Sequence, residues 1–160
     1  MIFLKHALYT LLLSLSLLSV ALPSHAMTTM AGKPVKMEQL VGKGRWTAIE
    51  IWASTCSICR QTIHHLIEID QRLPTIDVFG ISIDDQAGKA EAQRFIQQHK
   101  MRFPNFLSNA AEVDAYLVKH ADETFLGTPT LLLFSPQGKL VAVQPGPVTA
   151  TELKDFIKTL

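Results

Sequence analysis

Stretches that have the apolar pattern of buried strands alternate along this chain with stretches that have a helical period. Trp46 to Ala53 is nearly all apolar and rich in β-branched and aromatic residues, which is typical of a strand covered on both faces. From Ser57 to about Leu73 the apolar residues recur at three- and four-residue spacing, which predicts a helix. The same reasoning predicts further strands at 76–83, 130–134 and 140–143. It predicts a helix at 86–99 capped by Asp84 and Asp85, a helix after Asn109 and a last helix capped by Thr149. This alternation predicts an α/β domain with a mixed central sheet and helices on both faces.

The chain has two cysteines, Cys56 and Cys59, and both lie at the junction between the first strong strand and its helix. A disulfide between residues three positions apart closes almost no loop, so it would constrain the unfolded chain very little. Reactivity therefore explains the pair better than stability does. At the helix N-terminus, Cys56 lies beside unpaired N–H groups and the positive end of the helix dipole, which favour the thiolate, the nucleophile of disulfide exchange. We expect Cys56 to attack, Cys59 to act as the more buried resolving thiol, and the two to form a redox-active disulfide.

The same Cys-x-x-Cys spacing also occurs in zinc sites, which need four protein ligands. The sequence contains no second pair of this kind. His64 and His65 follow the cysteines on the same predicted helix, so the spacing alone leaves a metal role open. Exposed helix residues are the simpler interpretation of these histidines, and we expect neither a metal site nor a cofactor.

Glu50 is the one charged residue within the apolar run from Trp46 to Ala53. Burial of a carboxyl group in a doubly covered strand raises its pKa and lets it hold a proton near neutral pH. Such a group could accept the proton of Cys59 when that thiol attacks. The alternative is that Glu50 lies at a strand end or on an uncovered edge and is simply solvated.

The N-terminal residues 1–26 are typical of a secretory signal peptide. Lys5 precedes an apolar run from Ala7 to Leu22, and Ser24-His25-Ala26 places small residues before a cleavage point. The run is shorter than the roughly 20 residues of a membrane-spanning helix, so we expect cleavage, with an uncleaved membrane anchor as the alternative. Removal of this segment leaves 14 basic and 14 acidic residues, a balance that gives no electrostatic reason to bind nucleic acid or anionic lipid.

Two segments far apart in the chain match known motifs in the expected order. Trp52-Ala53-Ser54-Thr55-Cys56-Ser57-Ile58-Cys59-Arg60 is similar to the motif F-W-A-x-W-C-x-x-C-R of the thioredoxin superfamily. Gly127-Thr128-Pro129-Thr130 resembles the loop that bears the cis-proline of that family. The chain from Ala31 to Leu160 resembles the periplasmic TlpA/ResA-like branch, which implies one thioredoxin-like domain over residues 27–160.

The resemblance implies a substrate-binding surface around the cysteine pair. It implies that Pro129 is cis and packs against the cysteines, which leaves the Thr128 backbone free to pair with an extended substrate. The remaining residues that the resemblance assigns to substrate binding are Trp52, Ser57 and Ile58. Thr55 stands where the family usually has Trp, which removes an aromatic side chain from this surface. Glu50 matches the position of the buried acid of thioredoxin.

As the resemblance implies, the expected function is that of a periplasmic thiol–disulfide oxidoreductase. We expect it to act as a reductase that delivers electrons to oxidised protein substrates and is itself kept reduced by a membrane electron carrier. One alternative is an oxidase or isomerase, which would differ in reduction potential. Another is a copper-handling binding protein that uses Cys56, Cys59 and a histidine such as His64 or His120, because soft thiolates suit Cu(I).

Overall fold

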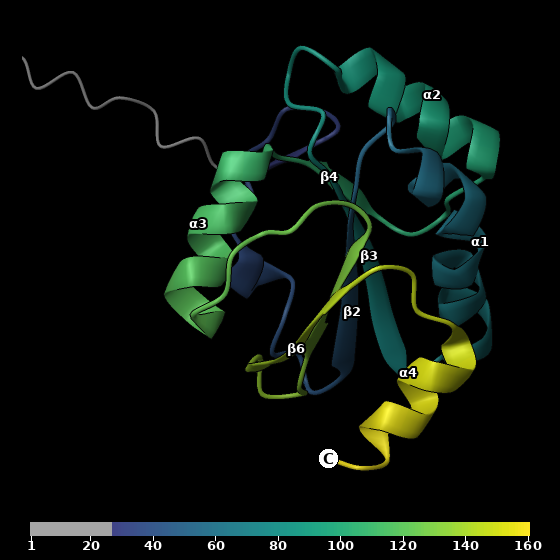
Figure 1. Ribbon diagram of the computed structural model, residues 1–160, viewed down its shortest axis with the longest axis vertical. Coiled ribbons are helices and arrows are strands. Elements are labelled where there is room, and N and C mark those ends of the chain that lie inside the picture. Colours follow the sequence, from purple (N-terminus) through teal and green to yellow (C-terminus); the bar gives the residue numbers. More distant parts are fainter. Residues whose placement is uncertain (1–26) are drawn as a thin grey trace, which may run out of the picture.

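The computed structural model describes residues 27–160, which form one mixed sheet covered by helices on both faces (Figure 1). The six strands of the described part lie in the order β1-β4-β3-β2-β5-β6. Their bounds are β1 Thr28–Thr29, β2 Trp46–Trp52, β3 Ile76–Ser82, β4 Asn105–Leu107, β5 Thr130–Phe134 and β6 Leu140–Pro145. β2 pairs in parallel with β3 and antiparallel with β5, so the strand that leads to the cysteines lies near the centre of the sheet.

The helices separate into two layers. Their bounds are η1 Met37–Gln39, α1 Ser57–Arg72, α2 Lys89–His99, α3 Ala110–Ala121 and α4 Ala150–Ile157. The buried side chains of α1, α2 and α4 belong to one hydrophobic cluster, and those of α3 belong to a second cluster on the opposite face of the sheet. Figure 1 shows the same division, with α3 on one side of the strands and the other three long helices on the other side. The predicted α/β class and the thioredoxin-like fold are confirmed.

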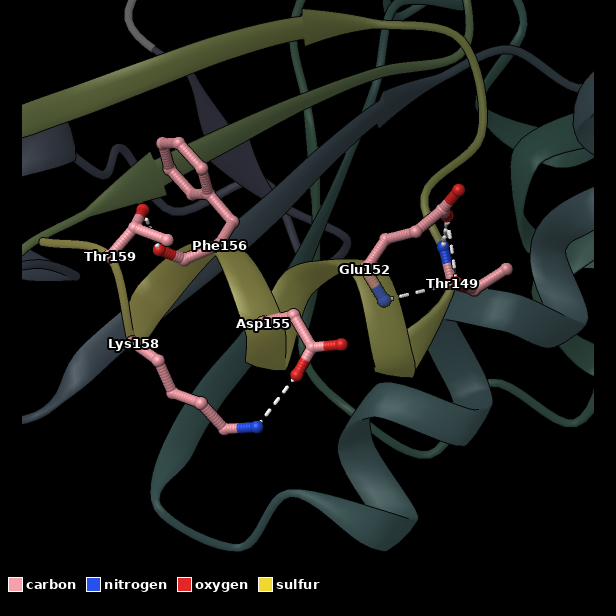
Figure 2. Close-up of polar contacts among 6 residues, drawn as sticks. All are labelled: Thr149, Glu152, Asp155, Phe156, Lys158 and Thr159. Carbon is pink, nitrogen blue, oxygen red and sulfur yellow. Dashed lines mark hydrogen bonds and ion pairs between the residues drawn. The ribbon is translucent and has the colours of Figure 1, made fainter.

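The last helix, α4, has the N-cap that the sequence predicts. Thr149 Oγ1 accepts a hydrogen bond from the Glu152 N–H at 3.2 Å, and the Thr149 N–H donates to Glu152 Oε2 at 2.8 Å (Figure 2). Such a reciprocal capping box satisfies two N–H groups that the helix itself leaves unpaired. At the other end of α4, Lys158 pairs with Asp155 at 2.6 Å.

The predicted start of the second helix is wrong. The sequence predicts a helix from Gln86 capped by Asp84 and Asp85, whereas α2 begins at Lys89 with Gly88 as its N-cap. Asp85 has a positive φ of 57°, which ends the strand region in a turn. The Asp84 carboxylate forms hydrogen bonds with Ser54 instead.

Gly80 in β3 lies under a hydrogen bond that joins β2 and β4, the two strands on either side of β3. Trp52 Nε1 donates to Asn105 Oδ1 at 3.2 Å, and a Cβ on Gly80 would lie 2.1 Å from that oxygen and 2.8 Å from that nitrogen. Gly80→Ala is therefore expected to lower the free energy of unfolding by about 2–4 kcal/mol, through overpacking and loss of this bond. Urea denaturation measures this change. Asn105→Ala should cost less in the Gly80→Ala background than in the wild type, and equal costs in both would contradict the proposed clash.

The expected signal segment, residues 1–26, lies outside the described residues. Within residues 27–160, none of the helices is both long enough and apolar enough to cross a bilayer.

Candidate active site

The two cysteines form a disulfide at the point where β2 leads into α1, as expected. Cys56 is the N-cap of α1, and its N–H donates to the Ala53 carbonyl at 3.1 Å, which closes the turn between strand and helix. Cys56 is partly exposed, whereas Cys59 is 0% exposed. A substrate disulfide can therefore reach the sulfur of Cys56 but not that of Cys59, which supports the assignment of Cys56 as nucleophile and Cys59 as resolving thiol.

The sulfur of Cys56 has two polar neighbours with opposite effects on a thiolate. The Cys59 N–H donates to Cys56 Sγ at 3.0 Å, which stabilises negative charge on that sulfur. The Thr128 carbonyl oxygen lies 3.4 Å from the same sulfur, and its partial negative charge opposes an anion there. The guanidinium of Arg60 donates to the Ser54 carbonyl at 3.0 Å rather than to the sulfur.

The loop before β5 lies against the cysteine pair through Thr128. The peptide bond between Thr128 and Pro129 is cis, as the resemblance implied. Pro129 is buried and Thr128 is partly exposed. The Gly146 N–H donates to the Pro129 carbonyl at 2.8 Å, and Thr130 Oγ1 donates to the Gly127 carbonyl at 2.6 Å. These two bonds hold the loop on both sides of the proline and keep the Thr128 backbone next to Cys56.

Glu50 lies in the middle of β2, between Gly80 of β3 and Leu131 of β5. Its side chain is on the same face as those of Ala48 and Trp52, because alternate residues of a strand share a face. Those two residues belong to the hydrophobic cluster that contains Cys59. Glu50 is 2% exposed, so the solvated alternative is wrong. Burial raises the pKa of Glu50 to about 8, and its Oε1 has no hydrogen-bond partner within the described part of the chain.

The sequence model of the AhpC/TSA family matches residues 19–143, which include the cysteine pair, Glu50 and the cis-proline loop. The chain belongs to this family. Its relatives place it in the TlpA/ResA-like branch of the thioredoxin superfamily. Together with the Cys56–Cys59 disulfide, this makes the protein a thiol–disulfide oxidoreductase.

Curated and solved relatives of this family member agree with that assignment. The thiol-disulfide oxidoreductase ResA of Bacillus subtilis (strain 168) is 23% identical over 139 residues, which cover 86% of this chain and 73% of ResA. A DsbF homologue from Corynebacterium diphtheriae has a TM-score of 0.67 at 21% identity, with 83% of this chain and 82% of that one covered. A secreted Mycobacterium tuberculosis disulfide oxidoreductase, homologous to E. coli DsbE, has a TM-score of 0.62 at 19% identity. The matched region covers 83% of this chain and 93% of that protein's chain. These structures share the thioredoxin-like fold.

The residues expected to bind substrate do not all lie at the surface of this AhpC/TSA family member. Ser57 is exposed, and Ile58 is 51% exposed although it is a large apolar residue. Trp52, by contrast, is 0% exposed, and its ring stacks on Phe95 of α2 with a centroid distance of 4.7 Å. Its side chain cannot contact a docked substrate, so its expected role is corrected to one in the core beneath the active site.

The histidines proposed as metal ligands lie on two helices, α1 and α3, on opposite faces of the sheet. The rings of His64 and His65 lie side by side on α1 at an interplanar angle of 45°, whereas His120 stacks on Tyr116 on α3, which covers the other face of the sheet. Residues 27–160 contain no group of three or more histidine, cysteine, aspartate or glutamate residues arranged to hold a metal ion. The copper alternative therefore finds no third ligand of these types beside the cysteines in the described part.

Two features of the site were missed at the level of sequence. Leu126, three residues before the cis-proline, is 76% exposed although it is a large apolar residue. Asp84 forms hydrogen bonds with the loop that precedes Cys56. No local pattern predicts the contact of Asp84, because its partner Ser54 lies 30 residues earlier in the sequence.

Proposed function

We propose that this oxidoreductase acts as a reductase of disulfides in exported proteins. In this proposal it reduces a disulfide of a protein substrate and then regains two electrons from a membrane electron carrier. The alternatives are an oxidase or isomerase, which would use the same residues at a higher reduction potential.

The observation that carries the proposal is the modest stabilisation available to a Cys56 thiolate. A strong oxidant of this superfamily owes its potential to a reduced form that is stabilised, which requires a well-stabilised thiolate. Here one N–H donates to Cys56 Sγ, and the Thr128 carbonyl faces the same atom. Among residues 27–160, no lysine or arginine side chain donates a hydrogen bond to this sulfur, since Arg60 is bound to Ser54. This environment favours the disulfide form of the enzyme over the thiolate, as expected for a reductase.

The proposed reaction begins with attack of the Cys56 thiolate on one sulfur of a substrate disulfide. This step forms a mixed disulfide and releases the other substrate sulfur as a thiolate, which takes up a proton. Cys59 then loses its proton to the Glu50 carboxylate and attacks Cys56 Sγ. The Cys56–Cys59 bond forms and the substrate leaves with both sulfurs reduced. Two electrons and two protons from the carrier restore the dithiol.

The substrate surface in this proposal surrounds Cys56. The Thr128 backbone would pair with an extended substrate segment, as an added strand pairs with a sheet edge. Ser57 and Ile58 would contact the residues beside the substrate cysteine, since both are exposed.

We place the protein in the periplasm on the basis of its N-terminal segment. The sequence of residues 1–26 predicts export and cleavage, and retention of this segment would instead tether the domain to the membrane. The secreted relative from Mycobacterium tuberculosis supports export.

The reduction potential of the purified protein tests the proposed direction of electron flow. We expect a value of about −200 to −270 mV, in the range of glutaredoxins and thioredoxin. Equilibration with glutathione or dithiothreitol buffers, followed by alkylation of free thiols and mass spectrometry, measures it. A value near about −120 mV, typical of a strong oxidant, would overturn the reductase proposal and favour an oxidase.

A further inference from the structure

The Asp84 carboxylate joins the end of β3 to the loop that carries the nucleophilic cysteine. It accepts the Ser54 N–H at 2.9 Å on Oδ2 and 3.1 Å on Oδ1, and the Ser54 hydroxyl at 2.8 Å on Oδ1. The Ser82 hydroxyl donates to Oδ2 at 2.6 Å. The two oxygens therefore bind three donor groups, two of them from a residue that lies two positions before Cys56.

Ser54 is held on its other side as well. Its carbonyl accepts a hydrogen bond from Arg60 Nη2 at 3.0 Å, so its N–H, hydroxyl and carbonyl all have partners. Ser54 is only 9% exposed although it lies in an active-site loop. The backbone is also held by the hydrogen bond that the Cys56 N–H donates to the Ala53 carbonyl at 3.1 Å. The backbone that leads to Cys56 is thus fixed from β3 through Asp84 and from α1 through Arg60.

We propose that Asp84 is a positioning residue for disulfide exchange, which acts through Ser54 to hold Cys56 Sγ beside Cys59. Cys59 lies within α1 and is fixed by the helix, whereas Cys56 is the N-cap and depends on the preceding loop for its position. Restricting this loop raises the effective concentration of one thiol at the other, and so stabilises the Cys56–Cys59 disulfide relative to the dithiol. The inference rests on exchange at this cysteine pair and holds for either direction of electron flow.

Two substitutions of Asp84 distinguish an effect of its hydrogen bonds on the position of Cys56 from an effect of its negative charge. Asp84→Asn removes the negative charge but keeps an oxygen that can accept the Ser54 N–H and an amide that can donate to a serine hydroxyl. Asp84→Ala removes the charge and every one of these bonds. Asp85→Asn is a matched control, because Asp85 is the adjacent aspartate and is exposed. Among the described residues its carboxylate accepts only the Gln86 N–H. Asparagine also tolerates the positive φ of this position.

The test is the equilibrium between the Cys56–Cys59 disulfide and glutathione, measured on the full folded domain. Asp84→Ala is expected to raise the dithiol-to-disulfide ratio about tenfold, which corresponds to a potential higher by about 30 mV. Asp84→Asn is expected to change the ratio less than about threefold, and Asp85→Asn to leave it unchanged. A purely structural role would lower the free energy of unfolding without moving this ratio.

Two results would overturn the proposal. Equal shifts in Asp84→Asn and Asp84→Ala would show that charge, and not position, is responsible. An unchanged dithiol-to-disulfide ratio in a folded Asp84→Ala variant would show that the loop holds Cys56 in position without Asp84. If Asp84→Ala fails to fold, Ser54→Ala replaces it, because it removes the hydrogen bond from the Ser54 hydroxyl to Asp84. Ser54→Ala should raise the dithiol-to-disulfide ratio about two- to threefold. An unchanged ratio in that variant would equally overturn the proposal.

Discussion

Cys59→Ser is expected to accumulate a stable mixed disulfide between Cys56 and its protein substrates, whereas Cys56→Ser is expected to lose exchange altogether. The reason is the difference in access between the two sulfurs. Cys56 is partly exposed at the start of α1, and Cys59 is 0% exposed behind it. Without Cys59, release of the substrate requires an external thiol. Intramolecular attack has an effective concentration of about 10⁵ M or more, so we expect the mixed disulfide to persist at least about a thousandfold longer.

Non-reducing electrophoresis and mass spectrometry of acid-quenched samples measure the trapped species. The double variant Cys56→Ser/Cys59→Ser provides the background, and addition of dithiothreitol should release every trapped partner. Trapping by Cys56→Ser instead would reverse the two roles. Loss of activity in both single variants without any trapped species would contradict a mixed-disulfide mechanism. The partners recovered on Cys59→Ser also identify the natural substrates.

The sheet and the place of the cysteines could be predicted because their signals are local. The change from a continuous apolar run to a helical period falls at Cys56, and β2 ends at Trp52 and α1 begins at Ser57 as that change requires. Thr149 caps α4 as predicted, and its capping-box partner Glu152 lies only three residues away in the sequence.

The misassigned residues depend instead on partners that are distant in sequence. Asp84 resembles a helix cap, but Ser54, 30 residues earlier, supplies two donors to its carboxylate, and α2 begins later as a result. Trp52 belongs to the active-site motif, yet its place in a doubly covered strand directs its ring onto Phe95. Neither outcome follows from residue type and spacing alone, because each depends on which strands become neighbours.

Glu50→Gln is expected to stabilise the folded protein above neutral pH and to leave its stability almost unchanged near pH 4. Burial raises the pKa of Glu50 from 4.5 to about 8, which corresponds to about 5 kcal/mol. Between these two pH values the folded state holds a proton that the unfolded state has lost, so wild-type stability falls as pH rises. Glutamine is neutral throughout and avoids this cost. The difference should therefore grow from about pH 4.5 and level off above about pH 8.

Denaturant unfolding of the oxidised protein at pH 4, 6, 7 and 9 measures this difference. Glu123→Gln is the matched control, because Glu123 is exposed and the same substitution there should change stability by less than about 0.5 kcal/mol at every pH. A constant difference between Glu50→Gln and the wild type across this range would show that burial does not raise the pKa of Glu50.

The same variant separates the burial of Glu50 from its proposed role in proton transfer. A carboxyl group with a pKa of about 8 is well matched to a thiol, whose ordinary pKa is about 8.5, and general bases of this kind contribute about 10²- to 10⁴-fold in rate. We expect Glu50→Gln to slow attack by Cys59 at least about tenfold near pH 7, and less near pH 9.5, where the thiol ionises unaided. Stopped-flow reduction of a mixed disulfide measures this step. A change in stability with an unaltered pH–rate profile would leave Glu50 as a buried acid and remove it from the reaction.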